Sequence, residues 1–335
     1  MRALLHRTKI PLSMVLAMAG AVLVASEANS YYLYVINLCM INAIAAVGLV
    51  ILSGVAGQIS LGTAALLAIG SYSTAIMMVH LGLGFLPAAV LSAFVTTVIG
   101  TILAGPALRL TGLHVAIVTL AFGIIVVQLI GKGGKLTGGM SGMTLPPVTI
   151  LGWAIDNEWR RFIAILIPFV LVTAGSIRFL RLKPGRALRA LREREVAAQT
   201  LGINSSAYKI LAFAYASFLG GVSGALYAGL KGYISVDDFT LWNSIYFFVM
   251  IALGGMTSII GGVAGAFLVT AAPEFLRGFQ EASQAVFGVL LFVIVVFLPG
   301  GIVAPFAGLR RRLSTRQTRA TAPNTDEGQS GDPPR

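Results

Sequence analysis

A charged segment between two long apolar runs restricts the fold of this chain more than any other feature. Residues 182–209 read LKPGRALRALREREVAAQTLGINSSAYK, whereas Phe162–Leu180 and Ile210–Leu230 on either side are almost wholly apolar. About 20 apolar residues cross the hydrocarbon core of a bilayer as a helix. Each ionised side chain in hydrocarbon costs several kcal/mol. The chain therefore predicts two membrane spans joined by a helical segment in water or at the membrane surface.

The composition is that of a polytopic membrane protein. Of 335 residues, 57% are hydrophobic and 11% are charged, against about 25% charged residues in soluble domains. The formal charge of +12 could suggest a nucleic-acid-binding protein, but Arg and Lys gather at the N-terminus, in 182–209 and in the tail. Basic residues concentrate on the cytoplasmic side of membrane proteins. These clusters therefore predict cytoplasmic N- and C-termini and a cytoplasmic loop.

The apolar runs predict an all-α fold, a polytopic transmembrane helical bundle of about 8 to 10 spans. The candidate spans are residues 10–26, 31–53, 60–79, 86–104, 113–131, 161–181, 209–230 and 284–304, with 241–272 as a further segment. The first run is interpreted as an uncleaved span, because no clear cleavage site follows it. We expect residues 1–313 to form the membrane domain and 314–335 a disordered cytoplasmic tail.

Two glycine-rich segments break the apolar pattern. Residues 241–272 are too long for one span and too short for two full spans. They predict either a segment that starts and ends on the outer side or two short tilted helices. Residues 52–70 contain a similar break and align with 253–271 after a shift of 201 positions. Paired breaks in two halves point to a transport site. We therefore expect a translocation path at Gly57, Gln58, Ser60, Gly62, Thr63, Gly254, Gly255 and Gly261.

Neutral polar residues inside the spans have two interpretations. Hydrogen bonding between helices is the more frequent role of such residues in membranes, and a pore lining is the other. The pore interpretation is strongest for Gln58, Ser60 and Thr63, which lie in the first break. The remaining members of the set are Asn37, Asn42, Thr119, Gln128 and Asn243.

The charged segment is expected to contain one helix from about 184 to 201. Pro184 and Gly185 suit its start, and Gly202 suits a left-handed cap at its end. Arg and Glu supply one surface of this helix. An apolar side is expected from Leu188, Leu191, Val196 and Ala198.

The order of these residues resembles one family. GRALRALREREVAAQTLGINSSAYKILAF (185–213) is similar to the loop-to-span sequence of permeases from branched-chain amino-acid ABC importers of the LivM type. The chain departs from the usual pattern of that family at Thr63, Ile124 and Gly300. Further stretches resemble the same family in order, at residues 32–72, 113–123, 136–143, 224–228, 251–266 and 287–302.

The resemblance implies a multi-pass inner-membrane permease that moves branched-chain or related small amino acids inward. It implies as partners a second permease, two cytoplasmic ATPases that bind the ATP and an extracytoplasmic solute-binding protein, with membrane lipid around it and no nucleic acid. The chain itself is expected to need no cofactor, and it has no GxxxxGK[ST] phosphate loop. The segment 182–208 would be the cytoplasmic coupling loop. Coupling to the ATPases is expected at Gly185, Arg186, Arg189, Arg192, Glu193, Glu195, Ala197, Ala198 and Gly202.

Two other classes of protein share part of this pattern. An ion-coupled secondary transporter of small polar solutes would also have many spans, but it normally keeps an ionisable relay inside the membrane. Here the Asp and Glu residues fall in loops, at span ends or in the tail. A membrane-embedded enzyme would need an acid–base or metal cluster, and Cys39 is the only cysteine. The sequence therefore predicts a transporter, with no catalytic or metal site.

Overall fold

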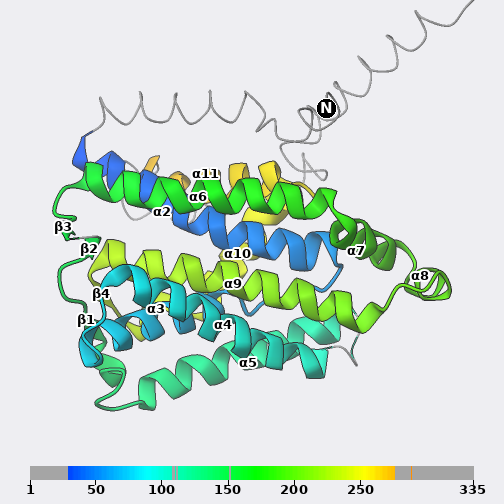
Figure 1. The fold of residues 1–335 in the computed structure, drawn as a ribbon, viewed down its shortest axis with the longest axis horizontal. Helices are drawn as coiled ribbons and strands as arrows, with labels where there is room; N and C mark the ends of the chain where they lie inside the picture. The colour runs from blue at the N-terminus through cyan, green and yellow to red at the C-terminus, as the bar shows by residue number, and fades with distance from the viewer. Residues whose placement is uncertain (1–28, 108–109, 111, 151, 276–287, 289–335) are drawn as a thin grey trace, which may run out of the picture.

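The computed structural model describes residues 29–107, 110, 112–150, 152–275 and 288 (Figure 1). Its helices are α2 (Ser30–Leu49), α3 (Thr63–His80), α4 (Phe85–Ala107), α5 (Leu113–Lys132), α6 (Glu158–Arg181), α7 (Lys183–Glu193), α8 (Glu195–Thr200), α9 (Ser205–Lys231), α10 (Leu241–Gly254) and α11 (Ile259–Phe275). The first of these continues directly into a π-helical turn, η1 (Val50–Val55). Two short 3-10 turns are η2 (Gly139–Ser141) and η3 (Val236–Phe239).

The predicted helical bundle is confirmed within these residues. Seven helical segments are long and apolar enough to cross a membrane. Each predicted span between 31 and 230 falls on one of them, from α2 to α9. The predicted spans 10–26 and 284–304 and the tail 314–335 lie outside the described residues.

The segment 241–272 forms two helices, one of the two predicted arrangements. Helix α10 ends at Gly254, and α11 begins at Ile259 after a four-residue turn. Gly255 in this turn has φ +114°, a conformation that side chains larger than hydrogen strongly disfavour. The two helices pack against each other, and α11 also lies along α2.

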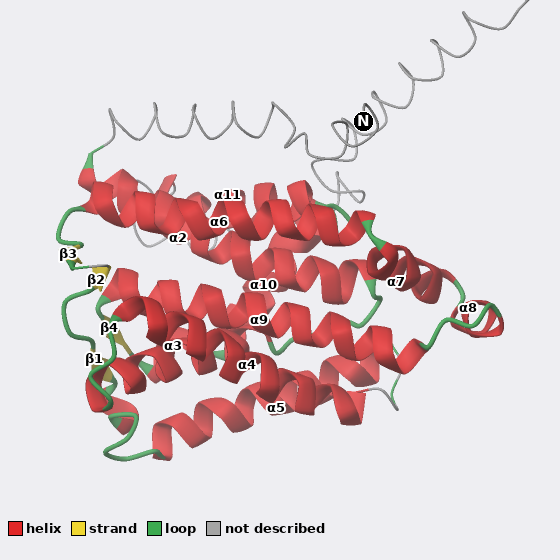
Figure 2. Cartoon of the chain, viewed as in Figure 1, coloured by secondary structure: helices red, strands yellow, loops and turns green. Residues whose placement is uncertain are grey.

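The two ends of the bundle differ in structure. Figure 2 shows short strands at one end, which we call the strand end, and α7 and α8 at the other, the α7–α8 end. The strands form two antiparallel pairs, β1 (Met143–Thr144) with β4 (Tyr233–Ile234) and β2 (Thr149–Ile150) with β3 (Trp153–Ala154). They are the one addition to the predicted all-α fold, and they lie in the connections between helices.

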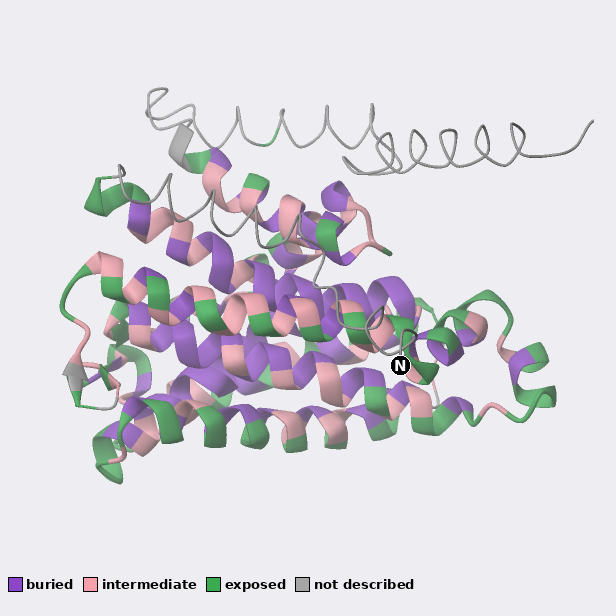
Figure 3. Ribbon diagram, turned by 45° about the horizontal axis from the view of Figure 1, so that its top comes forward, coloured by how far each residue is buried: buried purple, intermediate pink, exposed green. Residues whose placement is uncertain are grey.

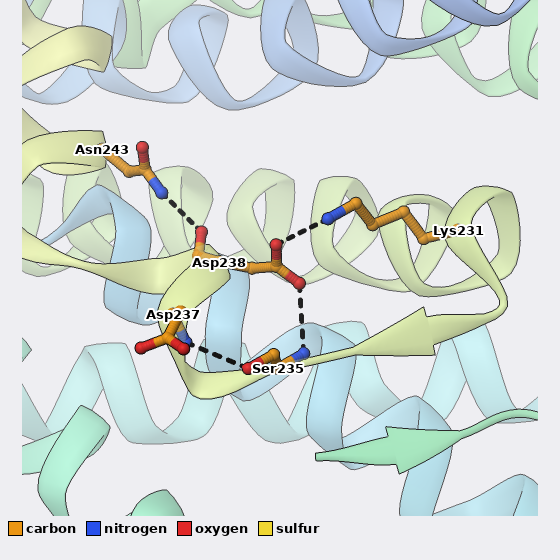
Figure 4. A network of polar contacts seen from close by, with 5 residues as sticks. All are labelled: Lys231, Ser235, Asp237, Asp238 and Asn243. Carbon is orange, nitrogen blue, oxygen red and sulfur yellow. Dashed lines mark hydrogen bonds and ion pairs between the residues drawn. The ribbon is translucent and has the colours of Figure 1, made fainter. Parts of the chain in front are cut away.

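A polar network fixes the turn between α9 and α10 at the strand end (Figure 4). The Lys231 ammonium lies 2.5 Å from Asp238 Oδ1, and the backbone N–H of Ser235 donates to Oδ2 of the same carboxylate at 3.1 Å. The Asn243 amide donates to the Asp238 carbonyl at 2.5 Å. These bonds satisfy the polar groups of a chain reversal between two apolar helices.

The core is centred on α2 and α9. Figure 3 shows buried residues along the central helices and exposed residues on the outer helices and at both ends. Helix α9 packs on α3 and α4 with very close backbones. A Cβ built on Gly224 would lie 2.2 Å from the Leu67 carbonyl oxygen, and one on Gly221 would lie 2.7 Å from Ala93 Cα. Small residues permit this approach, and close van der Waals packing is what holds helices together in a bilayer.

Candidate functional site

The first glycine-rich break lies between α2 and α3. The backbone N–H of Ala56 donates to the Ile51 carbonyl at 2.9 Å, five residues back, which widens the helix into its π turn. Gly57 follows with φ +72°, and helical structure resumes at Thr63. The π turn is a local rearrangement often found at functional sites.

Side-chain hydroxyls replace the helical hydrogen bonds of this break. Ser53 Oγ donates to the Gln58 carbonyl and accepts from the Ser60 N–H, both at 3.1 Å. The Leu61 N–H donates to Thr119 Oγ1 on α5 at 3.0 Å. Non-helical backbone at membrane depth persists only where such partners are present. The break is therefore a specific, hydrogen-bonded structure in the protein interior.

A hydroxyl from α10 caps the start of α3. The Ala64 N–H donates to Ser244 Oγ at 3.2 Å, across 180 positions of sequence. Gln58 is buried, and its Oε1 has no hydrogen-bond partner among the described residues. This amide oxygen is thus an unused acceptor inside the break.

The second break is held by contacts between glycine backbones. A Cβ built on Gly254 would lie 1.9 Å from the Gly261 carbonyl oxygen, and one on Gly261 would lie 2.4 Å from the Gly254 carbonyl oxygen. A Cβ on Gly265 would lie 1.9 Å from the Met250 carbonyl oxygen. Any side chain at these positions would force α10 and α11 apart.

The two breaks meet at Gly54. A Cβ at this position would lie 1.6 Å from the carbonyl oxygen of Met256, in the turn between α10 and α11. The end of η1 and this turn therefore touch backbone to backbone. The shift of 201 positions that relates the two segments pairs Gly54 with Gly255, the neighbour of Met256.

Helix α7 reaches the same point from the other side. The guanidinium of Arg192 donates to the Gly54 carbonyl oxygen. The methylene stem of this side chain passes over Gly57, where a Cβ would lie 3.1 Å from Arg192 Cγ. A residue predicted to couple and a residue predicted to line the path are thus in contact.

The charged segment forms two helices, so the predicted single helix from 184 to 201 is wrong. The backbone of Arg194 is extended, with φ −151° and ψ 98°, and separates α7 from α8. Glu195 at the start of α8 instead bonds to α9: its Oε1 accepts from Lys209 Nζ at 2.7 Å and also from the Ser205 hydroxyl. Because Lys209 is buried, this ion pair sets the position of α8.

The same contacts change the acidity of Glu195. The hydrogen bond from Lys209, and after it the bond from Ser205, holds the pKa of the Glu195 carboxyl below its ordinary value. Hydrogen bonds and a nearby positive charge both favour the ionised carboxylate. The Glu195 carboxyl is therefore ionised at neutral pH.

The remaining predicted coupling residues divide between the bundle and the surface. Gly185 is buried at the junction of α6 and α7, where a Cβ would lie 2.4 Å from Leu180 Cα, and Arg189 donates to the Leu180 carbonyl. Gly202 ends the segment with φ +82°, as predicted. Ala198 is buried, and the exposed members are Arg186, Arg189, Glu193, Ala197 and Gly202.

The apolar side predicted for this segment is only partly present. Leu188, Leu191 and Ala198 are buried, but Val196 is 76% exposed. Leu201 is 83% exposed on the same part of the chain. The break at Arg194 separates α8 from α7, and on α8 Ala198 faces the bundle while Val196 faces away from it. Exposed apolar residues rimmed by charges are typical of a protein interface.

A small recess adjoins the first break. It has a volume of about 180 Å³ and lies between α5, the start of α3 and the start of α10. Its polar groups come from Gln128, Thr240 and Ser244, and its apolar wall includes Leu120 and Ile124. Ser244 thus both caps α3 and lines the recess.

The predicted path residues lie around these contacts. Gln58, Ser60, Gly62 and Thr63 are buried in the first break, and Gly254 and Gly261 are buried in the α10–α11 contact. Gly57 and Gly255 are partly exposed. Of the polar residues inside spans, Asn42 bonds between helices as expected, to Thr270 Oγ1 at 3.1 Å. Buried Asn37 has no hydrogen-bond partner among the described residues.

Sequence reasoning missed three residues that join the site together. Gly54 falls within the aligned segment 52–70 but is not among the predicted path residues, and the predicted sites include neither Ser244 nor Lys209. Their partners lie between 14 and 180 positions away, beyond the reach of helical periodicity. Lys209 alone offered a cue, as a lysine within the first turn of an apolar span.

The described residues contain no cluster of three or more His, Cys, Asp and Glu side chains with the geometry to hold a metal ion. Cys39 is buried in α2 and has a free thiol. The polar contacts described at the site are hydrogen bonds and one ion pair, Glu195 with Lys209.

Comparison with known proteins finds related sequences. Residues 31–299 match the family described as branched-chain amino acid transport system / permease component. The chain is 31% identical over 291 residues to the high-affinity branched-chain amino acid transport system permease protein LivM of Salmonella typhimurium, covering 80% of this chain and 68% of the relative. The LivM protein of Escherichia coli gives the same identity and coverage.

A more distant relative is a probable branched-chain amino acid transport permease protein LivM of Methanocaldococcus jannaschii. It is 26% identical over 241 residues, covering 66% of this chain and 69% of the relative. No solved structure matches the chain.

Proposed function

Since the chain belongs to the family of branched-chain amino acid transport system permease components, we propose that it is the membrane-spanning subunit of an ABC importer. It moves branched-chain or related small amino acids inward, and ATP hydrolysis in partner subunits supplies the energy. Its partners are a second permease, two cytoplasmic ATPases and an extracytoplasmic solute-binding protein. The chain itself carries no cofactor, because the ATPases bind the ATP.

The proposed orientation follows from charge. The protein lies in the inner (plasma) membrane as a multi-pass subunit, with its N- and C-termini and its α7–α8 end in the cytoplasm. Arg186, Arg189 and Arg192 at that end fit the preference of basic residues for the cytoplasmic side. The strand end then faces outward, toward the solute-binding protein.

The contact between Arg192 and Gly54 carries the proposal. Helix α7 and the turn between α10 and α11 both touch this glycine. A displacement of α7 and α8 by the ATPases would therefore act on both glycine-rich breaks at one point. Such a rigid-body displacement can switch access to the path from one side of the membrane to the other.

The exposed part of the α7–α8 end is proposed as the docking surface for an ATPase. Val196 and Leu201 supply apolar contact, and Arg186 and Glu193 supply charge. Glu195 and Lys209 would transmit force from α8 into α9, on which α3 and α4 pack.

We place the translocation path along the first break and the recess beside it. The recess combines the hydroxyl and amide groups of Ser244 and Gln128 with the aliphatic side chains of Leu120 and Ile124. This combination suits a solute with a polar head and a small apolar side chain. Gly57, Gly62, Gly254 and Gly255 would let the surrounding backbone shift as the path opens.

The proposal is tested by reconstituting the chain with its partner subunits in vesicles loaded with ATP. Uptake of a branched-chain amino acid should require ATP and the binding protein, and it should survive an ionophore that dissipates ion gradients. Uptake driven by an ion gradient without ATP would instead establish the alternative, an ion-coupled secondary transporter.

A further inference from the structure

A large apolar groove lies between α4, α6 and α9, and none of its lining residues belongs to the glycine-rich breaks. It has a volume of about 1020 Å³. Helix α9 forms its floor with residues such as Phe218 and Val222, α4 forms one wall and α6 the other. The walls are open to the surroundings, since Val90, Phe94 and Ile167 are each at least half exposed.

The groove occupies the half of the bundle next to the strand end. Its α4 residues run from Phe85 to Phe94, in the first half of that helix, and its α6 residues run from Arg160 to Val172. The β2–β3 hairpin closes this end with Ile150 and Ala154. Trp159 in the first turn of α6 marks the membrane interface, where Trp is enriched and lipid headgroups lie.

One charged side chain lines this otherwise apolar groove. Arg160 lies at its interfacial end and donates to the Ala154 carbonyl at 2.9 Å. The neighbouring carboxylate, Glu158, instead pairs with Arg161 at 2.5 Å. Among the described residues Arg160 has no carboxylate partner, so its guanidinium has donors left for an anion at headgroup level.

The lining of the groove suits acyl chains. Apart from Arg160, its side chains are almost wholly apolar and come from α4, α6, α9 and the β2–β3 hairpin. Acyl chains are apolar, thin and flexible, so they can follow the length of such a groove.

From this geometry we infer that the groove is a binding site for a glycerophospholipid. The acyl chains lie along α9 between α4 and α6, and the lipid phosphate accepts hydrogen bonds from Arg160. Phosphate suits this end because guanidinium donors match its oxygens in a bidentate arrangement. The site is separate from the path and does not depend on the proposed transport function.

Lipid retention by the purified full-length chain with its partner subunits tests the inference. After repeated detergent washes, the lipid that remains is extracted and measured by mass spectrometry. The wild-type protein should keep phospholipid at a constant ratio to protein. Arg160→Gln should lower this retention by roughly tenfold, the effect of losing a charge-assisted hydrogen bond. Arg160→Lys keeps the charge without the bidentate geometry, so it should give a retention between those of Arg160→Gln and the wild type.

Two matched controls isolate the site. Lys132→Gln removes one exposed charge from the same end of the bundle and should leave retention unchanged. Ala89→Phe fills the groove and should reduce retention, whereas Ala121→Phe, on exposed α5 surface, should not. Equal retention in Arg160→Gln and Lys132→Gln would overturn the inference, as would a wild-type protein that keeps no phospholipid.

Photo-crosslinking decides what occupies the groove. Benzoylphenylalanine in place of Ile167 should give an adduct with the mass of a phospholipid. An adduct with the second permease, or with residues 10–26 or 284–304 of this chain, would show that a protein helix fills the groove and would overturn the lipid assignment. Neither this assay nor lipid retention requires transport, so failure of the proposed function leaves both interpretable.

Discussion

The guanidinium of Arg192 donates a hydrogen bond to the carbonyl oxygen of Gly54, 138 residues away in the chain. Gly54 in turn lies so close to the Met256 carbonyl that a Cβ would be 1.6 Å from its oxygen. Three segments therefore meet at one glycine: the α7 helix, the π turn that ends α2 and the turn between α10 and α11. A movement of any one of them changes the space available to the other two.

Replacing Arg192 should uncouple ATP hydrolysis from uptake. In Arg192→Ala the loss of a charged hydrogen bond costs about 1.5–3 kcal/mol. This corresponds to a roughly tenfold or greater fall in uptake relative to ATP hydrolysis. Uptake in reconstituted vesicles should fall by that factor while ATP hydrolysis continues. Arg181→Ala, an exposed arginine at the same end, is the control. Unchanged uptake in Arg192→Ala would reduce this contact to a structural one.

Adding a single carbon at Gly54 should disrupt the packing of this glycine against the turn between α10 and α11. In Gly54→Ala the new Cβ collides with the Met256 carbonyl, and overpacking of this kind costs about 1–3 kcal/mol. We expect a lower melting temperature and loss of uptake. Gly105→Ala in α4 meets nothing within 4 Å and should be neutral or stabilising by about 1 kcal/mol. Equal melting temperatures for the two variants would contradict the close contact.

The ion pair between Glu195 and Lys209 should make stability depend on pH. In the fold the pKa of the Glu195 carboxyl lies below its ordinary value of 4.5. The ion pair therefore stabilises the protein fully above about pH 4.5, and this stabilisation is lost as the pH falls through the lowered pKa. Glu195→Gln should therefore melt below the wild type at pH 7, since it leaves buried Lys209 without its carboxylate. The gap should narrow as the pH falls below 4.5.

A second substitution provides the control for this pair. Lys209→Met combined with Glu195→Gln removes both charges, which is often neutral or stabilising for a buried pair. The double variant should recover much of the stability lost in Glu195→Gln. Thermal melting of the purified complex at several pH values measures both effects. A gap between Glu195→Gln and the wild type that stays constant with pH would exclude the linkage.

Reporter fusions should place the two ends of α6 on opposite sides of the membrane. Asp156 precedes this helix and Arg194 lies between α7 and α8, so a span separates them. By the charge rule a fusion after Arg194 reads cytoplasmic and one after Asp156 reads extracytoplasmic. The reverse result would invert the proposed orientation. The same side for both would contradict α6 as a span.

Periodicity and charge predicted most of the fold but few of the contacts around Gly54. Every predicted span between 31 and 230 falls on a helix, because an apolar run of that length has few alternatives in a bilayer. The separation of α7 from α8 at Arg194 could not be predicted, since GRALRALREREVAAQT is a continuous helix former. The contact of Ser244 with Ala64 depends on how distant helices pack, which local sequence does not encode.

Filling the recess beside the first break should distinguish a path from a packing contact. Gly123 lines the recess, and a Cβ there would lie 3.9 Å from its nearest neighbour, Ala65 Cβ. The Cβ of Gly123→Leu therefore makes only ordinary van der Waals contact, and we expect the further carbons to occupy the recess. If solute passes here, uptake should fall by an order of magnitude or more while assembly with the ATPases and the melting temperature are retained. Ala121→Leu, on the exposed surface of the same helix, should transport normally because it adds similar bulk outside the recess.

Gln128→Leu should also lower uptake, since it removes a polar group from the lining and leaves the backbone contacts intact. Normal uptake in both Gly123→Leu and Gln128→Leu would exclude the recess from the path.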